Sequence, residues 1–319
     1  MTRVGVVDLG TNSTRLLVAD VDDGTVRELD RRLTITRLGE GVDERRLLLP
    51  TALARVRNTL SDYRRALEAK GAQRTLAVAT SAVRDAENGE AFLGEVEWSY
   101  GFVTRLLSGH DEALMTFRGV SAGRDVAEGT LVMDVGGGST ELVLGGPGGV
   151  AWHESLDLGC VRLTERFLRS DPPEPAELDA ARAQVHALLA DRVAADIRPL
   201  RAIGVAGTVT TLAVLSLGLD EEDPALVDGH ELRSGWIAEQ VERLAELPVA
   251  EIRGLRGMPP DRAPVILAGA VVVAETLGHF GLDVLEVSER DLMHGAALAA
   301  AELSERPEGD APAGAYTCC

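Results

Sequence analysis

The sequence predicts an α/β protein built from two similar domains. The main observation is an internal repeat, because D-L-G-T-N-S-T-R-L at residues 8–16 returns as D-V-G-G-G-S-T-E-L at 134–142. In both copies apolar residues precede the acid and follow the turn, so a whole strand–turn–strand unit is duplicated. Helical patterns alternate with further strands, and 319 residues suffice for two ordinary domains. We expect domains at residues 1–124 and 125–304, followed by a disordered tail at 305–319.

The elements follow from hydrophobic period and turn residues. The first domain is expected to open with three strands over residues 3–29. A helix should follow at 48–71, with Thr51 as its N-cap and Gly71 as its C-terminal stop. The remaining expected elements are a strand at 74–80, a helix at 110–123, strands within 130–145, a long helix after Pro175, a strand and helix over 201–218, helices around 233–246 and 260–278, and a strand at 283–289.

Composition excludes several function classes. A formal net charge of -19 repels nucleic acid and anionic membranes, so a polyanionic substrate needs a local pocket of arginines and backbone amides. Lys70 is the only lysine and lies in a polar helix end, which disfavours lysine-dependent mechanisms. Cys160, Cys318 and Cys319 form neither a disulfide framework nor a metal-type spacing. With no signal peptide or membrane span apparent, we expect a cytoplasmic protein.

The two glycine turns are predicted to bind phosphate. A tight glycine turn after a strand lets backbone N–H groups point into one space, which holds an anion without a cationic side chain. Neither turn is a Walker A motif, and neither has the G-x-G-x-x-G pattern of a dinucleotide site. Ordinary hairpin turns are the alternative, but the duplication with the same preceding acid favours phosphate binding. The predicted phosphate-binding residues in the turns are Gly10, Thr11, Asn12, Ser13, Gly136, Gly137, Gly138, Ser139 and Thr140.

Acidic residues next to the turns are candidate metal ligands. Asp134 and Glu141 bracket the second turn, and Asp8 occupies the equivalent place in the first. Oxygen ligands of this kind suit Mg2+ (or Mn2+), although an aspartate at a strand end can also simply cap a turn.

Arg84 lies just after a predicted strand end, where it could bind phosphate bidentately or pair with Asp85 or Glu87. Arg15 replaces the acid of the repeat, and we expect it to face the same site.

Several segments together resemble the Ppx/GppA phosphatases, which comprise exopolyphosphatases and guanosine pentaphosphate phosphohydrolases. The segments are VVDLGTNSTRLLVADV, VATSAVRDAEN, LLSGHDEA, VMDVGGGSTEL, LDLGCVRLTERFL, GVAGTVTTLA and VSERDLMHGAAL, running in order from about residue 4 to 300. The resemblance, to the short two-domain form, implies two actin-like (ribonuclease H-like, ASKHA superfamily) domains with an interdomain cleft.

The resemblance also implies residue roles. Its water-activating glutamate corresponds to Glu112, the second acid after the S-G turn, and its metal lies near Asp134 and Glu141. The acid before Glu112 is Asp111, which departs from the family's usual glutamate and leaves open which acid is the base.

The expected function is metal-dependent release of terminal phosphate from inorganic polyphosphate by a homodimer. Guanosine pentaphosphate is the alternative substrate, which an aromatic content of only 3% disfavours slightly. A small-molecule kinase would need an acceptor motif that we do not find, and a non-catalytic polyphosphate or nucleotide sensor would not need Glu112, Asp134 and Glu141.

Arg162 and Arg166, one helical turn apart, are candidates for guiding a long anion, and Cys160 is expected to be a small buried residue.

Overall fold

The computed structural model describes residues 1–304 and divides into two compact units. Unit 1 contains Met1–Arg124 together with the described residues from Leu292 to 304, and unit 2 is Asp125–Asp291. The predicted tail at 305–319, with Cys318 and Cys319, lies outside the described residues. Within residues 1–304, no helix combines the length and apolar character needed to cross a membrane.

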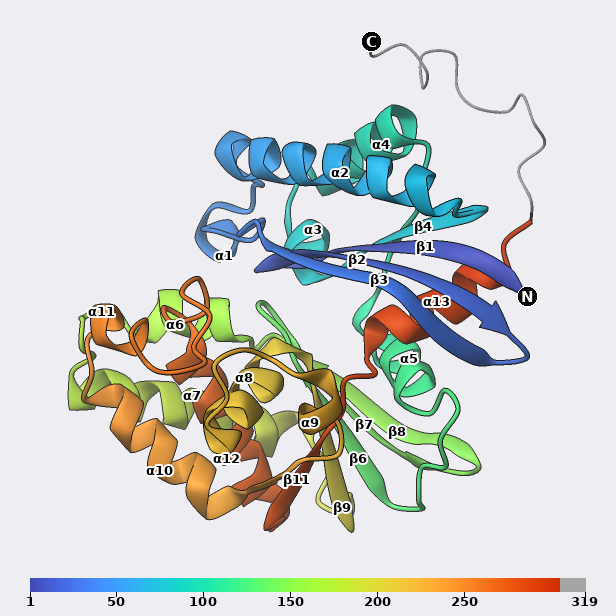
Figure 1. Ribbon diagram of the computed structural model, residues 1–319. Helices are drawn as coiled ribbons and strands as arrows, with labels where there is room; N and C mark the ends of the chain where they lie inside the picture. The colour runs from blue at the N-terminus through green and yellow to red at the C-terminus, as the bar shows by residue number, and fades with distance from the viewer. Residues whose placement is uncertain (305–319) are drawn as a thin grey trace. The chain divides into compact units, whose positions relative to one another are not determined.

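Unit 1 is built on a five-stranded sheet (Figure 1). In spatial order its strands are β3 (Thr25–Ile35), β2 (Ser13–Asp22), β1 (Thr2–Leu9), β4 (Arg74–Ala79) and β5 (Val103–Leu106). The first three are antiparallel, whereas β4 and β5 continue parallel to β1. Its helices are α1 (Val42–Arg45), α2 (Pro50–Lys70), α3 (Ser81–Asp85), α4 (Gly89–Tyr100), α5 (Gly109–Val120) and α13 (Leu292–Ala301).

Both faces of this sheet are buried. On β1, Val7 and Leu9 pack with α2 and α4, while Val4 and Val6 on the opposite face pack with α13. The strand therefore reads as a continuous apolar run, as is usual where helices cover both faces. α2 begins with Pro50 at its first turn, so Thr51 lies inside the helix instead of capping it, and Gly71 ends it in the left-handed conformation as predicted.

α13 packs in unit 1, which differs from the predicted domain of residues 125–304. The helix contacts α5 and β1, and it is buried along nearly its whole length. Gly295 allows this approach, because a Cβ there would lie 1.9 Å from the carbonyl oxygen of Met115. The chain thus returns to the first unit after completing the second, a crossing that sequence order alone does not reveal.

Unit 2 has a six-stranded sheet. Its spatial order is β10 (Glu231–Arg233), β11 (Val284–Val287), β9 (Arg201–Val205), β6 (Thr130–Val135), β7 (Thr140–Gly146) and β8 (Gly149–Leu156). The helices are α6 (Cys160–Phe167), α7 (Pro175–Arg192), α8 (Ala206–Leu217), α9 (Pro224–Val227), α10 (Ser234–Ala245), α11 (Val249–Ile252) and α12 (Ile266–Phe280). α12 begins six residues later than the predicted 260–278, because Pro264 disfavours helical backbone at the residue before it.

The repeat is confirmed at the level of topology. In unit 1 the antiparallel pair β1–β2 is extended by β4, which runs parallel to β1. In unit 2 the antiparallel pair β6–β7 is extended in the same way by β9, which runs parallel to β6. Two α/β units, each with a mixed sheet, are therefore present as predicted.

Candidate functional site

In unit 1 the predicted site residues follow the carboxyl ends of three parallel strands. Leu9 of β1 is in register with Ala79 of β4, which is in register with Leu106 of β5. The glycine turn, the segment with Arg84 and the segment with Glu112 each begin where one of these strands ends. Strand carboxyl ends are where open α/β sheets bind ligands.

The first turn has its carbonyl oxygens occupied and its amides available. It is closed by a hydrogen bond from the Gly10 amide to the Ser13 carbonyl at 3.0 Å. The carbonyls of Thr11 and Asn12 accept bonds of 2.8 to 3.1 Å from backbone amides of the segment 36–39. The Thr11 and Asn12 amides donate to no residue in 1–304, and nor does the buried Asn12 Nδ2. Buried donors without acceptors are rare in proteins, and clustered ones form anion sites.

The second turn repeats this arrangement. The Gly136 amide donates to the Ser139 carbonyl, again at 3.0 Å. The carbonyls of Gly136 and Gly137 accept hydrogen bonds from the first backbone amides of α6. The Gly138 carbonyl accepts a hydrogen bond of 2.8 Å from the Nε of Arg162. The amides of Gly137 and Gly138 donate no hydrogen bond within the described part of the chain. Each turn therefore presents two unused backbone donors.

Sequence reasoning missed the segment 36–39 that supports the first turn. Its one signal is Gly39, where a Cβ would lie 2.3 Å from the Thr11 side chain. The turn is also tied to the start of α3, because the hydroxyls of Thr11 and Ser81 are 2.8 Å apart. These contacts fix the turn's shape independently of any ligand.

Three side chains have roles that the structure clarifies. Arg162 is only 9% exposed and supports the second turn, so it does not guide an anion at the surface as predicted. The Nε of Arg15 donates to the Asp8 carboxylate at 2.8 Å, so this arginine neutralises the acid of its own turn. Cys160 is buried, and burial raises the pKa of its thiol, which fits the expected structural role.

A further glycine-containing turn, at Ala206 and Gly207 where α8 begins, has an arginine against it. Ala206 has a positive φ of 67°, which is uncommon for a residue other than glycine. A Cβ at Gly207 would lie 1.8 Å from the Arg262 guanidinium, so any other residue there would displace the end of that side chain.

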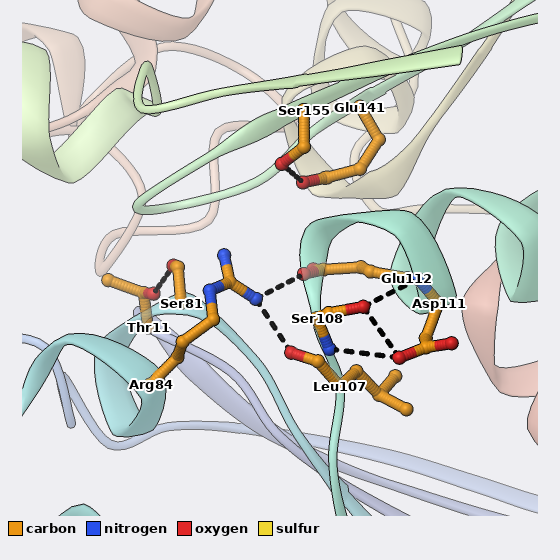
Figure 2. A network of polar contacts seen from close by, with 9 residues as sticks. All are labelled: Thr11, Ser81, Arg84, Leu107, Ser108, Asp111, Glu112, Glu141 and Ser155. Atoms are coloured by element: carbon orange, nitrogen blue, oxygen red, sulfur yellow. Dashed lines mark hydrogen bonds and ion pairs between the residues drawn. The ribbon is translucent and has the colours of Figure 1, made fainter. Parts of the chain in front are cut away.

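In unit 2 two buried acids lie opposite one another. Asp134 on β6 pairs in register with Glu141 on β7, which pairs in register with Ser155 on β8. Directly paired residues place their side chains on one face of the sheet. Asp134 is 6% exposed and Glu141 1%, and the Ser155 hydroxyl donates to Glu141 Oε1 at 2.8 Å (Figure 2). Ser155 was not predicted, because nothing in the sequence marks β8 as the neighbour of this pair.

Of the three predicted metal ligands, Asp134 and Glu141 lie on paired positions within the described part of unit 2. No group of three or more histidine, cysteine, aspartate or glutamate side chains is placed to hold a metal within residues 1–304. Mg2+ keeps several waters and needs only one or two protein carboxylates, so the pair fits such an ion.

In unit 1, Arg84 on α3 contacts Glu112 on α5. The Nη1 of Arg84 lies 3.3 Å from Glu112 Oε2 and donates to the Leu107 carbonyl at 2.8 Å (Figure 2). Glu112 is 6% exposed, and the Arg84 side chain is 24% exposed. The predicted arginine and the predicted base are therefore neighbours.

Asp111 has a separate, structural role. It forms a capping box with Ser108 at the start of α5, in which the Ser108 hydroxyl and amide both contact the Asp111 carboxylate. The hydrogen bond from the Ser108 side chain holds the pKa of Asp111 below its usual range. A carboxyl made more acidic and engaged in this way is a poor base, so the geometry favours Glu112 over Asp111.

Comparison with known proteins agrees with this geometry. A model of the Ppx/GppA phosphatase family matches residues 17–303. The chain is 39% identical over 325 residues to Exopolyphosphatase 2 of Mycobacterium tuberculosis, covering 94% of this chain and 99% of that protein. A crystal structure of an exopolyphosphatase-like protein superposes with a TM-score of 0.87 at 34% identity, covering 93% of this chain and 98% of the other. The Aquifex aeolicus Ppx/GppA structure gives 0.78 at 31%, covering 95% and 99%. The predicted family is thus confirmed, and the chain belongs to the Ppx/GppA phosphatase family.

Proposed function

We propose that this protein is an exopolyphosphatase, which hydrolyses the terminal phosphoanhydride bond of inorganic polyphosphate. The proposal rests on the pair of glycine turns. Each turn has two backbone N–H groups that donate no hydrogen bond to any residue in 1–304. A polyphosphate chain has enough anionic oxygens to accept a hydrogen bond from every one of these N–H groups. The name and similarity of the Mycobacterium tuberculosis relative support the same substrate class.

Glu112 is the group we propose to activate the attacking water. It is buried at the start of α5, and its acidic neighbour Asp111 is occupied by the helix cap. Arg84, anchored beside it, supplies positive charge for the phosphoryl group that is transferred. In the reaction the glutamate accepts a proton from water, the water oxygen bonds to the terminal phosphorus, and the bond to the bridging oxygen breaks. Orthophosphate is released, and the bridging oxygen leaves with the bonding electrons as the new end of a polyphosphate one unit shorter.

Asp134 and Glu141 are the proposed ligands of a divalent metal, Mg2+ or Mn2+. Phosphatases of this family are generally metal-dependent. Two buried carboxylates on opposed positions repel each other, and a divalent cation relieves that repulsion. When bound, the ion would neutralise phosphate charge. Asp8 already has a cation in Arg15, so we assign it the task of orienting that arginine rather than holding metal.

Guanosine pentaphosphate is the alternative substrate, since its terminal phosphoanhydride requires the same chemistry. Phosphate release from short polyphosphate, long polyphosphate and guanosine pentaphosphate should be measured side by side, each with Mg2+ and with a chelator. We expect polyphosphate to be the best substrate and the chelator to stop release. Faster turnover of guanosine pentaphosphate would reverse the substrate assignment. Release of free phosphate without an acceptor argues against a kinase.

The role of the base is tested by E112Q. The change removes a buried carboxylate's proton-accepting capacity but preserves its shape, so we expect a folded protein without phosphate release. Glu90, an exposed glutamate in the first turn of α4, provides the control E90Q, which should keep wild-type activity. A fully active E112Q would exclude Glu112 as the base.

A further inference from the structure

We propose that Arg84 is a positioning residue for Glu112 as well as a phosphate ligand, and that the Leu107 carbonyl fixes it in both roles. The inference rests on the proposed function, because it assigns how the proposed base is held. Its basis is that one nitrogen, Nη1, makes all the hydrogen bonds and ion pairs of the Arg84 side chain within residues 1–304.

The Leu107 carbonyl is the anchor of this arrangement. Its oxygen accepts from Arg84 Nη1 at 2.8 Å, whereas the contact from Nη1 to Glu112 Oε2 is longer, at 3.3 Å. The position of the guanidinium is therefore set by backbone, not by the carboxylate. Leu107 immediately precedes the Ser108 cap of α5, so the anchor and the base belong to one short segment. Figure 2 shows the guanidinium meeting both the Leu107 carbonyl and Glu112.

The remaining nitrogens of Arg84 are available to a ligand. Neither Nε nor Nη2 contacts any polar partner among residues 1–304, and the side chain is partly exposed. An arginine whose purpose was only to pair with Glu112 would gain most from a bidentate contact, which uses two nitrogens. Arg57 makes such a contact with Glu95, using Nε and Nη2 at 2.6 and 2.8 Å. Arg84 instead contacts the Glu112 carboxylate through Nη1 alone, so that Nε and Nη2 can bind phosphate together.

This geometry ties the base to the phosphate that it serves. Because the guanidinium is planar and rigid, a phosphate on one edge and a carboxylate at the opposite corner are held at a fixed separation. The carboxylate then meets the attacking water in one orientation. Displacements of about 1 Å in such constellations can lower a rate roughly 100-fold.

The test is the substitution Arg84→Lys, read as separate effects on kcat and KM for polyphosphate. Lysine keeps the positive charge that attracts phosphate, but one ammonium cannot bridge carbonyl, carboxylate and phosphate. We expect kcat to fall about 100-fold while KM changes by less than about threefold. R84Q, which keeps one amide donor for the Leu107 carbonyl but loses the charge, should lower kcat and raise KM. R57K is the matched control, and both of its constants should stay at wild-type values.

The outcomes separate this inference from the proposed function. If R84K raises KM by a larger factor than it lowers kcat, Arg84 is a phosphate ligand alone and the positioning role is overturned. A fall in kcat that exceeds the rise in KM supports it. E112Q is assayed in the same series, and full activity there would instead remove the proposed base, whatever R84K does. Circular dichroism of each variant establishes that it is folded.

Discussion

We predict that Glu141→Gln raises the stability of the protein relative to wild type without metal and lowers it when metal is bound. Asp134 and Glu141 are buried and directly paired, which places their Cβ atoms about 4.5–5.5 Å apart. Two unit charges at a separation of about 5 Å would repel by about 3 kcal/mol at an effective dielectric constant near 20, which sets the scale for two ionised carboxylates on paired positions. Glutamine removes one charge and still accepts the Ser155 hydroxyl bond. Without divalent metal, E141Q should therefore be more stable than wild type, by about 1 to 3 kcal/mol.

Metal should reverse this order. At 100 times its dissociation constant, an ion that binds only the folded state adds about 2.7 kcal/mol. The wild type should gain this stabilisation from Mg2+, whereas E141Q, with one carboxylate lost, should gain little and should lose phosphate release. For a unit of this size, 1 kcal/mol corresponds to a shift in Tm of about 2–4 °C. The assay is thermal unfolding of both proteins in chelator and in a Mg2+ titration.

The control is Glu154→Gln on the same strand as Ser155. Glu154 pairs with Arg192 near the surface, so its loss should cost less than about 1 kcal/mol and leave the response to Mg2+ unchanged. A wild-type protein whose Tm is the same in chelator and in Mg2+ would refute the assignment of the pair. So would an E141Q variant with the full wild-type response.

Two further predictions concern stability within unit 1. Ser108→Ala removes the N-cap of α5 and should cost about 1 kcal/mol at neutral pH, measured by urea unfolding. Because the folded-state pKa of Asp111 lies below its unfolded value near 3.9, its contribution is present above that pH and is lost as pH falls through the folded pKa. The difference between S108A and wild type should therefore shrink below about pH 4, and a constant difference would contradict the role of the cap. Gly295→Ala forces a methyl group against the Met115 carbonyl and should cost about 1 to 3 kcal/mol. Gly278→Ala, in a helix with open space, should be neutral or stabilising, and equal effects of the two would exclude the close approach.

Local features of the fold were predictable because their causes are local. The strands around the turns are marked by β-branched residues, and Gly71 ends α2 because only a left-handed residue suits that position. The turns were recognisable from the duplication itself. α13 was not predicted, because a helix buried on every side has no polar face to give a helical period.

Long-range partners of the site were beyond local patterns. The sequence identified the glycine turns and Arg84, but not the segment 36–39 or the α6 amides that occupy the turn carbonyls. Those contacts join residues that are far apart in the chain, so no spacing rule reports them. Arg162 illustrates the consequence, since its helical spacing indicated an exposed cation while packing made it a buried support.

The duplication produces two turns of one shape whose neighbouring charged residues differ. Both are closed by the same glycine-to-serine bond at 3.0 Å, and both begin after a strand-end aspartate. The residue opposite that aspartate is Arg15 in one copy and Glu141 in the other. In the first copy the aspartate forms an ion pair with Arg15, whereas in the second copy two buried carboxyl side chains stand opposite one another. The proposed metal ligands therefore differ from the first copy at a single position of the repeat, where Glu141 stands in place of Arg15.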